Sequence, residues 1–258
     1  MNPARPTVRG AGVLALAVLA VGIGACSADP DVPQAAHASA TTEVSAQATP
    51  PSPTTEQPQT TRQVDHSLDD EMFAAVADND AALVRDLIAR GADMETRGDK
   101  GRTPLVAATK NRASEAAVAL IEAGADVNAK DDLQDSAYLY AGAEGFDEIL
   151  EPTLRHGADL RSVNRYGGTA LIPASEHGHV STVRMLIAAG VDVNHVNTPQ
   201  WTALQEAIVY GDGSQRYQET VTALLDAGAD PQIRDADGRT ALQNAERLDQ
   251  DAIVALLR

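Results

Sequence analysis

The chain has 258 residues, a formal net charge of -17 and a single cysteine. This length allows one or two domains. The acidic composition argues against nucleic-acid binding, because a phosphate backbone is bound by Lys and Arg side chains that displace its counterions. One cysteine cannot form an intramolecular disulfide, so the composition excludes an extracellular fold held together by disulfides.

Residues 1–25 have the pattern of a secretory signal peptide. Arg5 and Arg9 form a positively charged start, and an apolar run, AGVLALAVLAVG, begins at Ala11. The uncharged stretch is shorter than the roughly 20 residues that a permanent transmembrane helix needs. We therefore interpret this segment as an export signal.

The apolar run ends in IGAC, which closes on Cys26. This tetrapeptide resembles the lipobox of bacterial lipoproteins, in which the cysteine is diacylated and becomes the first residue of the mature chain. The resemblance implies that Cys26 is a lipidation site, and two acyl chains are enough for stable membrane anchoring. The alternatives are an ordinary signal peptide with an incidental cysteine and a cysteine buried in the core.

Residues 26–66 comprise the cysteine and a segment rich in Pro, Thr and Ser. From Ser27 to His66 the chain contains six prolines and no aromatic residue. Such a composition cannot bury enough apolar surface to offset its chain entropy, so we expect a disordered stalk. Stalks of this composition can also be O-glycosylated.

The remainder of the chain repeats two marks at one period. The first mark is a glycine, usually in Gly-Ala-Asp, and the second is Thr-Pro-Leu, Thr-Ala-Leu or a close variant. Both marks recur after 33 residues three times and then after 38. The glycines lie at positions 91, 124, 157, 190 and 228, and the second marks begin at Thr103, Ser136, Thr169, Thr202 and Thr240. A shared period of this length is typical of repeat proteins.

Segments such as GRTPLVAATKN and AVALIEAGADVN resemble the ankyrin repeat. The resemblance covers residues 67–258 and implies an all-α solenoid of six helix-turn-helix units with hairpin fingers. The first unit lacks the Thr-Pro-Leu mark and the last stops before its glycine, as is typical of capping repeats. The expected units span about 67–99, 100–132, 133–165, 166–198, 199–236 and 237–258.

Individual residues predict the ends of the helices. The threonines of the second mark (Thr103, Thr169, Thr202 and Thr240) are expected N-caps, and Pro104 suits a first helical position. Tight turns between paired helices are expected at Asn79, Gly145, Gly178 and Gly211. The five mark glycines should end the second helices in the left-handed conformation. The expected apolar stripes are Leu87-Ile88, Leu120-Ile121, Leu186-Ile187, Leu224-Leu225 and Leu256-Leu257.

Three features depart from the family pattern. The histidine that often follows Thr-Pro-Leu is absent from every unit. Pro152 falls inside a second helix and Pro173 inside the first turns of a first helix, where proline removes a hydrogen bond. Five extra residues around Asp212–Arg216 are expected to form a longer surface loop.

No residue constellation indicates catalysis, a metal ion or a cofactor. His177 and His179 lack a third ligand at suitable spacing, and their positions suit a structural role. The DADGRT segment does not fit a calcium-binding loop and is expected at a finger tip. The pair Asp131 and Asp132 is likewise expected to be solvated on a finger tip. We therefore expect no enzyme activity.

In ankyrin proteins the finger tips and the first helices form a recognition surface. Arg, Tyr and Trp dominate the energy of many interfaces, so those residues are the expected contacts. They are Arg165, Tyr166 and Trp201 first, followed by Tyr140, Tyr210, Arg97, Arg102, Arg234 and Arg239. The alternative for Trp201 is that it packs against the neighbouring finger.

Together these features predict an exported bacterial lipoprotein that is anchored to the cell membrane and faces the periplasm or cell-wall space. Its repeat domain would be a monomer that binds an envelope protein in an adaptor or regulatory role. One alternative is an accessory protein that stabilises or inhibits an envelope enzyme. A glycan-binding protein or a hydrolase is a further alternative.

Overall fold

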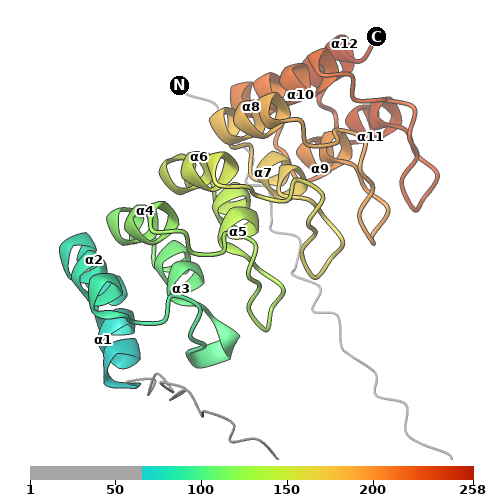
Figure 1. Cartoon of the computed structure of the whole chain (residues 1–258). Helices are drawn as coiled ribbons and strands as arrows, with labels where there is room; N and C mark the ends of the chain where they lie inside the picture. Colours follow the sequence, from blue (N-terminus) through green and yellow to red (C-terminus); the bar gives the residue numbers. More distant parts are fainter. Residues whose placement is uncertain (1–65) are drawn as a thin grey trace, which may run out of the picture. The chain divides into compact units, whose positions relative to one another are not determined.

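A computed structural model describes residues 66–258, and within this range all regular structure is helical (Figure 1). The expected signal peptide, Cys26 and the stalk lie outside the described residues. None of the described helices has the length and apolar character required to span a membrane. The helices are α1 (His66–Ala77), α2 (Ala81–Arg90), the 3-10 turn η1 (Asp99–Gly101), α3 (Pro104–Lys110), α4 (Ser114–Glu122), α5 (Ala137–Glu144), α6 (Asp147–Arg155), α7 (Leu171–Glu176), α8 (Val180–Ala189), α9 (Ala203–Val209), α10 (Gln215–Asp226), α11 (Ala241–Arg247) and α12 (Asp251–Leu256).

The helices form antiparallel pairs that stack side by side in two layers (Figure 1). The first helices of successive pairs pack on one another from α1 through α3, α5, α7 and α9 to α11, and the second helices do so from α2 to α12. A finger projects between consecutive pairs on the side of the first helices. The predicted all-α solenoid of six helix-turn-helix units is confirmed.

Most first helices begin at a hydroxyl cap. The Oγ atoms of Thr103, Thr202 and Thr240 each accept a hydrogen bond from the backbone N–H three residues later, at 3.2–3.3 Å. Ser136, which we did not predict, does the same for α5 at 3.2 Å. Pro104 is the first residue of α3, as predicted, because its missing N–H leaves no helical bond unmade there.

The predicted cap at Thr169 is wrong. Helix α7 begins at Leu171 without a side-chain cap, and the buried Oγ of Thr169 has no hydrogen-bond partner. Pro173 explains the difference, because it has no N–H to donate to the Thr169 carbonyl four residues earlier. That carbonyl instead accepts from Ile172 N at 3.2 Å in a tighter turn, so the helix starts late.

The glycines of the repeated Gly-Ala-Asp mark end the second helices as predicted. Their φ angles lie between 86° and 97°, which is the left-handed region. Asn79, Gly145 and Gly178 also have positive φ, but Gly211 does not. In that unit the left-handed residue is Gly213, because the extra residues shift the turn along the chain. Gly211 is needed for another reason, since a Cβ there would lie 2.1 Å from the Ala207 carbonyl oxygen.

The insertion in the fifth unit is only partly a loop, which corrects the expectation for Asp212–Arg216. Helix α10 begins at Gln215 and has 12 residues, whereas the corresponding helix α8 has 10. Some of the extra residues therefore lengthen a helix. Pro152 lies inside α6, which continues past it to Arg155.

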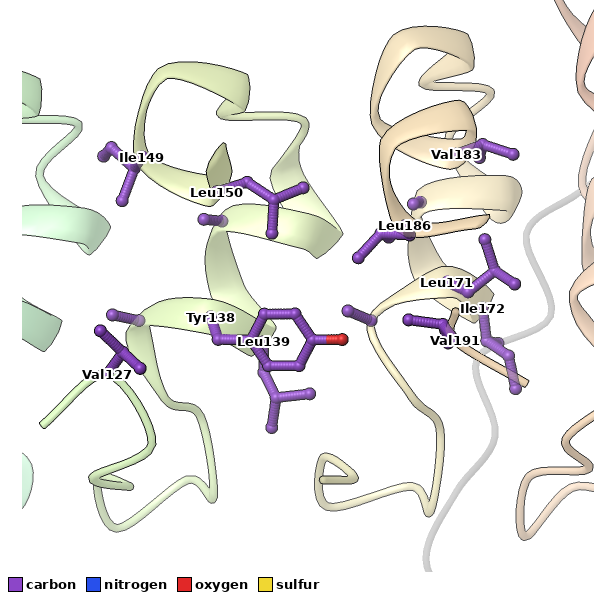
Figure 2. Packing of buried hydrophobic residues seen from close by; sticks show 14 of the residues in the cluster. Val127, Tyr138, Leu139, Ile149, Leu150, Leu171, Ile172, Val183, Leu186 and Val191 are labelled. Atoms are coloured by element: carbon purple, nitrogen blue, oxygen red, sulfur yellow. The ribbon is translucent and has the colours of Figure 1, made fainter. Parts of the chain in front are cut away.

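Apolar side chains from neighbouring units form one continuous core. Figure 2 shows its central part, where Tyr138 points from α5 toward the next unit. The leucines predicted to face the core from the second helices of four units are fully buried: Leu87, Leu120, Leu186 and Leu224. In the last unit the prediction is wrong for Leu256, which is 41% exposed, whereas Leu257 is partly buried and packs against the core. Helix α12 also contributes the buried side chains of Ile253 and Val254.

This packing predicts that Leu186→Ala lowers the free energy of unfolding by about 2–5 kcal/mol, because it leaves a cavity between units. The exposed Leu256→Ala change is the matched control and should cost less than about 0.5 kcal/mol. Urea unfolding followed by circular dichroism measures both. Equal midpoints for the two variants would contradict the packing described here.

Candidate protein-binding face

The finger turns are built alike at residues 98–102, 131–135, 164–168, 197–201 and 235–239. In each, the backbone N–H of the first residue donates to the carbonyl of the last, at 2.9–3.0 Å. From the second finger onward the first residue is Asp or Asn, and its side-chain oxygen accepts backbone N–H groups of the same turn: these residues are Asp131, Asn164, Asn197 and Asp235. Such side chains stabilise turns by imitating a backbone acceptor.

We did not predict that these four side chains stabilise the finger turns, although the period that they share could have revealed this role. The turns and the adjacent first helices α3, α5, α7, α9 and α11 form a surface that we call the finger face. Six of the nine predicted binding residues lie on it, whereas Arg97 and Arg234 directly precede a turn and Tyr210 directly follows α9.

Arg97, Arg234 and Arg239 are already engaged by groups of their own finger or of the next one. Arg97 donates to the carbonyls of Gly101 and Lys130, at 2.8 and 2.7 Å. Arg234 donates to the Gly238 carbonyl at 2.6 Å, and Arg239 pairs with Asp237. These arginines stabilise turns and links between units, which makes them weaker candidates for partner contacts.

Asp131 is buried, so the prediction that it is a solvated finger-tip charge is wrong. The Lys110 ammonium lies 2.7 Å from Asp131 Oδ2 and 2.8 Å from Asp135 Oδ2, and the Lys110 side chain is 8% exposed. Its Nζ also lies 4.9 Å from the centre of the Tyr140 ring. Arg102 Nε lies 3.8 Å from Asp131 Oδ2. We call this group of charges and the Tyr140 ring the Lys110 cluster.

The Lys110 cluster keeps Asp131 ionised. Burial alone raises the pKa of this carboxyl, but the Lys110 ammonium and the backbone N–H groups of Asp135 and Leu133 outweigh burial. The pKa of Asp131 therefore lies below its ordinary value. The charges of the cluster pair with one another, and Tyr140 and Arg102 take part in it, although the buried Arg102 Nε makes no hydrogen bond.

A second group lies further along the finger face. Arg165 lies over the Tyr166 ring, with 4.7 Å between the guanidinium carbon and the ring centre, and 3.8 Å from Asp135 Oδ2. The Trp201 and Tyr210 rings are in contact, with centroids 5.2 Å apart. Trp201 thus packs on a residue of its own unit. Tyr166 and Tyr210 are more than half exposed, at 55% and 56%.

A pocket of about 310 Å³ opens between these two tyrosines. Fingers 164–168 and 197–201 and helices α7 and α9 contribute its walls, which include Ile172, Pro173 and Pro199. Two carboxylates, Glu176 and Glu206, complete the lining. We did not predict Glu206 as a site residue; its signal in the sequence is the single charge within the helical segment ALQEAIV.

Glu206 is a buried carboxyl with an altered pKa. Only 6% of the residue is exposed, and its Oε1 accepts a hydrogen bond from Asn197 Nδ2 at 2.9 Å. Burial, reinforced by the negative charge of Glu176, raises the pKa of Glu206 to about 7, and the Asn197 bond offsets only part of this effect.

The two histidines singled out in the sequence are held structurally. Their rings meet edge to face, with centroids 5.4 Å apart, and His177 Nδ1 lies 2.9 Å from the Ala143 carbonyl oxygen. Among residues 66–258, no group of three or more His, Cys, Asp and Glu side chains is placed to hold a metal ion.

The sequence profile of the family described as "Ankyrin repeats (3 copies)" matches residues 71–160 and 138–235, which together exceed half of the chain. The chain belongs to the ankyrin-repeat family. Ankyrin-repeat proteins are typically protein-interaction scaffolds without enzymatic activity, so the finger face is the part of this fold to examine for a partner.

Two solved ankyrin-repeat structures are similar to the described fold. One is a crystal structure of an ankyrin repeat domain from Acinetobacter baumannii AYE, with 54% sequence identity and a TM-score of 0.70, over 72% of this chain and 95% of that chain. The other is the ankyrin repeat protein EF0377, with 39% identity and a TM-score of 0.70, over 73% of this chain and 96% of that chain. No curated protein sequence matches the chain significantly.

The raised pKa of Glu206 predicts a pH-dependent stability. Between pH 4.5, the ordinary pKa of the group, and about pH 7, folded Glu206 keeps a proton that the unfolded chain has lost, so its contribution to stability falls as the pH rises. We expect Glu206→Gln to match the wild type near pH 4 and to be more stable by about 1–3 kcal/mol at pH 8, because a buried charged oxygen is removed.

Urea unfolding at pH 4, 6 and 8 measures this difference. The control is Glu148→Gln on α6, which removes an exposed carboxylate and should leave the stability curve unchanged. A Glu206→Gln effect of the same size at all three pH values would contradict the assignment.

Proposed function

We propose that this ankyrin-repeat protein is an exported lipoprotein that is anchored to the cell membrane through Cys26 and binds a partner protein of the cell envelope with its finger face. The lipobox resemblance and the signal-peptide pattern support the anchor. The Pro-, Thr- and Ser-rich segment 26–66 would separate the repeat domain from the membrane. The repeat domain acts as a monomer, in an adaptor or regulatory role.

The exposed aromatic side chains on either side of the pocket are the observation that supports this function most strongly. Tyr166 and Tyr210 are large, exposed side chains whose rings already have neighbours: Arg165 over the first and Trp201 beside the second. Side chains that are held in place before binding lose little conformational entropy when a partner docks. Tyr, Trp and Arg are also the residue types enriched at the energetic centres of interfaces.

The anchor is tested by Cys26→Ser. We expect the wild-type chain in the membrane fraction of cells and the variant released from it, because the acyl acceptor is lost. Metabolic labelling with a fatty-acid analogue should mark the wild type only. Release of both chains, or labelling of the variant, would contradict the lipid anchor.

The binding surface is tested by crosslinking in cells with the full chain as bait, followed by pulldown. Changing Arg165, Tyr166 and Trp201 to Ala should reduce capture of the partner at least tenfold, because these side chains form the exposed aromatic group. A matched variant in which Arg155, Arg184 and Leu256 on the second helices are changed to Ala should capture as the wild type does. Circular dichroism confirms that both variants are folded. Loss of capture only in the second variant would place the docking surface on the second helices instead.

A further inference from the structure

The pocket between Tyr166 and Tyr210 occupies the place that the Lys110 cluster occupies two units earlier. The 33-residue period relates the two sites residue by residue. Lys110, Asp131 and Tyr140 of the first site correspond to Glu176, Asn197 and Glu206 of the second. One site contains an ammonium group, whereas the other has a carboxylate at the same position and an open volume beside it.

The Lys110 cluster shows how this fold accommodates a lysine side chain. The ammonium lies between two carboxylates, at 2.7 and 2.8 Å, and 4.9 Å from the centre of a tyrosine ring. The pocket supplies the same kinds of groups from different positions, without the ammonium. Two carboxylates and two tyrosines line it, and no Lys, Arg or His is among its described lining residues.

Glu206 has an unused acceptor in the wall of the pocket. Its Oε1 accepts from Asn197, but the buried Oε2 has no hydrogen-bond partner. Leaving a buried carboxylate oxygen unpaired is costly, and a cation that reached it would gain a strong charge-assisted hydrogen bond.

The next unit shows that a carboxylate is not required at this position for folding. The residues equivalent to Asn197 and Glu206 are Asp235 and Asn244, and Asn244 Nδ2 donates to Asp235 Oδ2 at 2.8 Å. The same link between finger and first helix is therefore made with an amide on the helix. In the Asn197–Glu206 pair the amide and the carboxyl group are exchanged, so the link is kept and the carboxyl group lies on the helix, in the pocket wall.

The tyrosine rings provide the remaining partner for a cation. Cations bind to the faces of aromatic rings, and Arg165 over Tyr166 shows that a ring beside this pocket accepts one. Tyr210 is held at the other side by Trp201, which leaves more than half of it exposed.

We propose that this pocket binds a lysine side chain of the partner protein, with its ammonium group between Glu206 and Glu176 and its stem against the Tyr166 and Tyr210 rings. This proposal rests on the proposed function, because it names the group of the partner that the finger face recognises. The strongly acidic chain would also attract a basic partner at long range.

A tyrosine-labelled NMR titration tests the pocket without knowledge of the partner. The chain has five tyrosines, of which Tyr138 and Tyr217 are buried and serve as internal references. The full chain in non-ionic detergent, with 13C-labelled tyrosine, is titrated with Nα-acetyl-lysine methylamide. The matched probe is the norleucine analogue, which has the same stem and no charge.

We expect the lysine probe to shift the Tyr166 and Tyr210 signals saturably and to bind at least tenfold more tightly than the norleucine probe. Glu206→Gln should weaken lysine binding at least tenfold, whereas Glu148→Gln should not change it. Tyr210→Leu should weaken it about two- to fivefold. Equal binding of the two probes, an unchanged affinity in Glu206→Gln, or the absence of any shift would overturn the proposal.

The titration tests the lysine pocket and the crosslinking experiment tests the docking surface, so each proposal can be refuted without the other. The lysine probe could cause no shift while partner capture still depends on Arg165, Tyr166 and Trp201. This result would refute the lysine pocket and leave the docking surface intact. A specific response to lysine, together with capture that does not depend on those residues, would refute protein docking at this face and leave a cation site.

Discussion

A single pair of short helices cannot bury its own apolar side chains, and this constraint determines the rest of the molecule. Each unit gains a core only when the next unit covers it, so the residues that fix how a unit begins and ends must recur at one spacing. The hydroxyl caps of the first helices and the left-handed glycines after the second helices are those residues. Polar bonds across the same boundary reinforce the stack, as when Asn128 Nδ2 donates to the Gly157 carbonyl and Asn194 Nδ2 to the Gly228 carbonyl.

Because the repeated residues maintain the stack, the positions that differ between units are available for function. The finger face shows this most clearly. Position 110 is a buried lysine in the second unit and its equivalent, Glu176, is a carboxylate beside a pocket in the fourth. The same scaffold thus makes a cluster in which an ammonium pairs with two carboxylates at one place, and a pocket with two carboxylates and no lining cation at another. The function proposed here depends on that difference and on the exposed tyrosines that flank it.

Most of the fold could be predicted from the sequence, because caps, turns and helix ends depend on local chemistry that repeats. The errors arose where a neighbour changed the outcome. Pro173 prevents Thr169 from capping α7, and the packing of α12 leaves Leu256 exposed. The candidate site was only partly predictable for the same reason. Tyr166 and Tyr210 stood out by residue type, but the burial of Asp131 and Glu206 depends on contacts between units that no single segment encodes.

In the function proposed for this protein, the finger face, and not the layer of second helices, meets the partner. The most direct measurement places a photo-crosslinking benzoylphenylalanine at position 166 or at position 184 of the full chain in living cells. Tyr166 lies beside the pocket, whereas Arg184 is exposed on α8 in the second-helix layer. We expect a discrete crosslinked adduct from position 166 and none from position 184. An adduct from position 184 alone would contradict it.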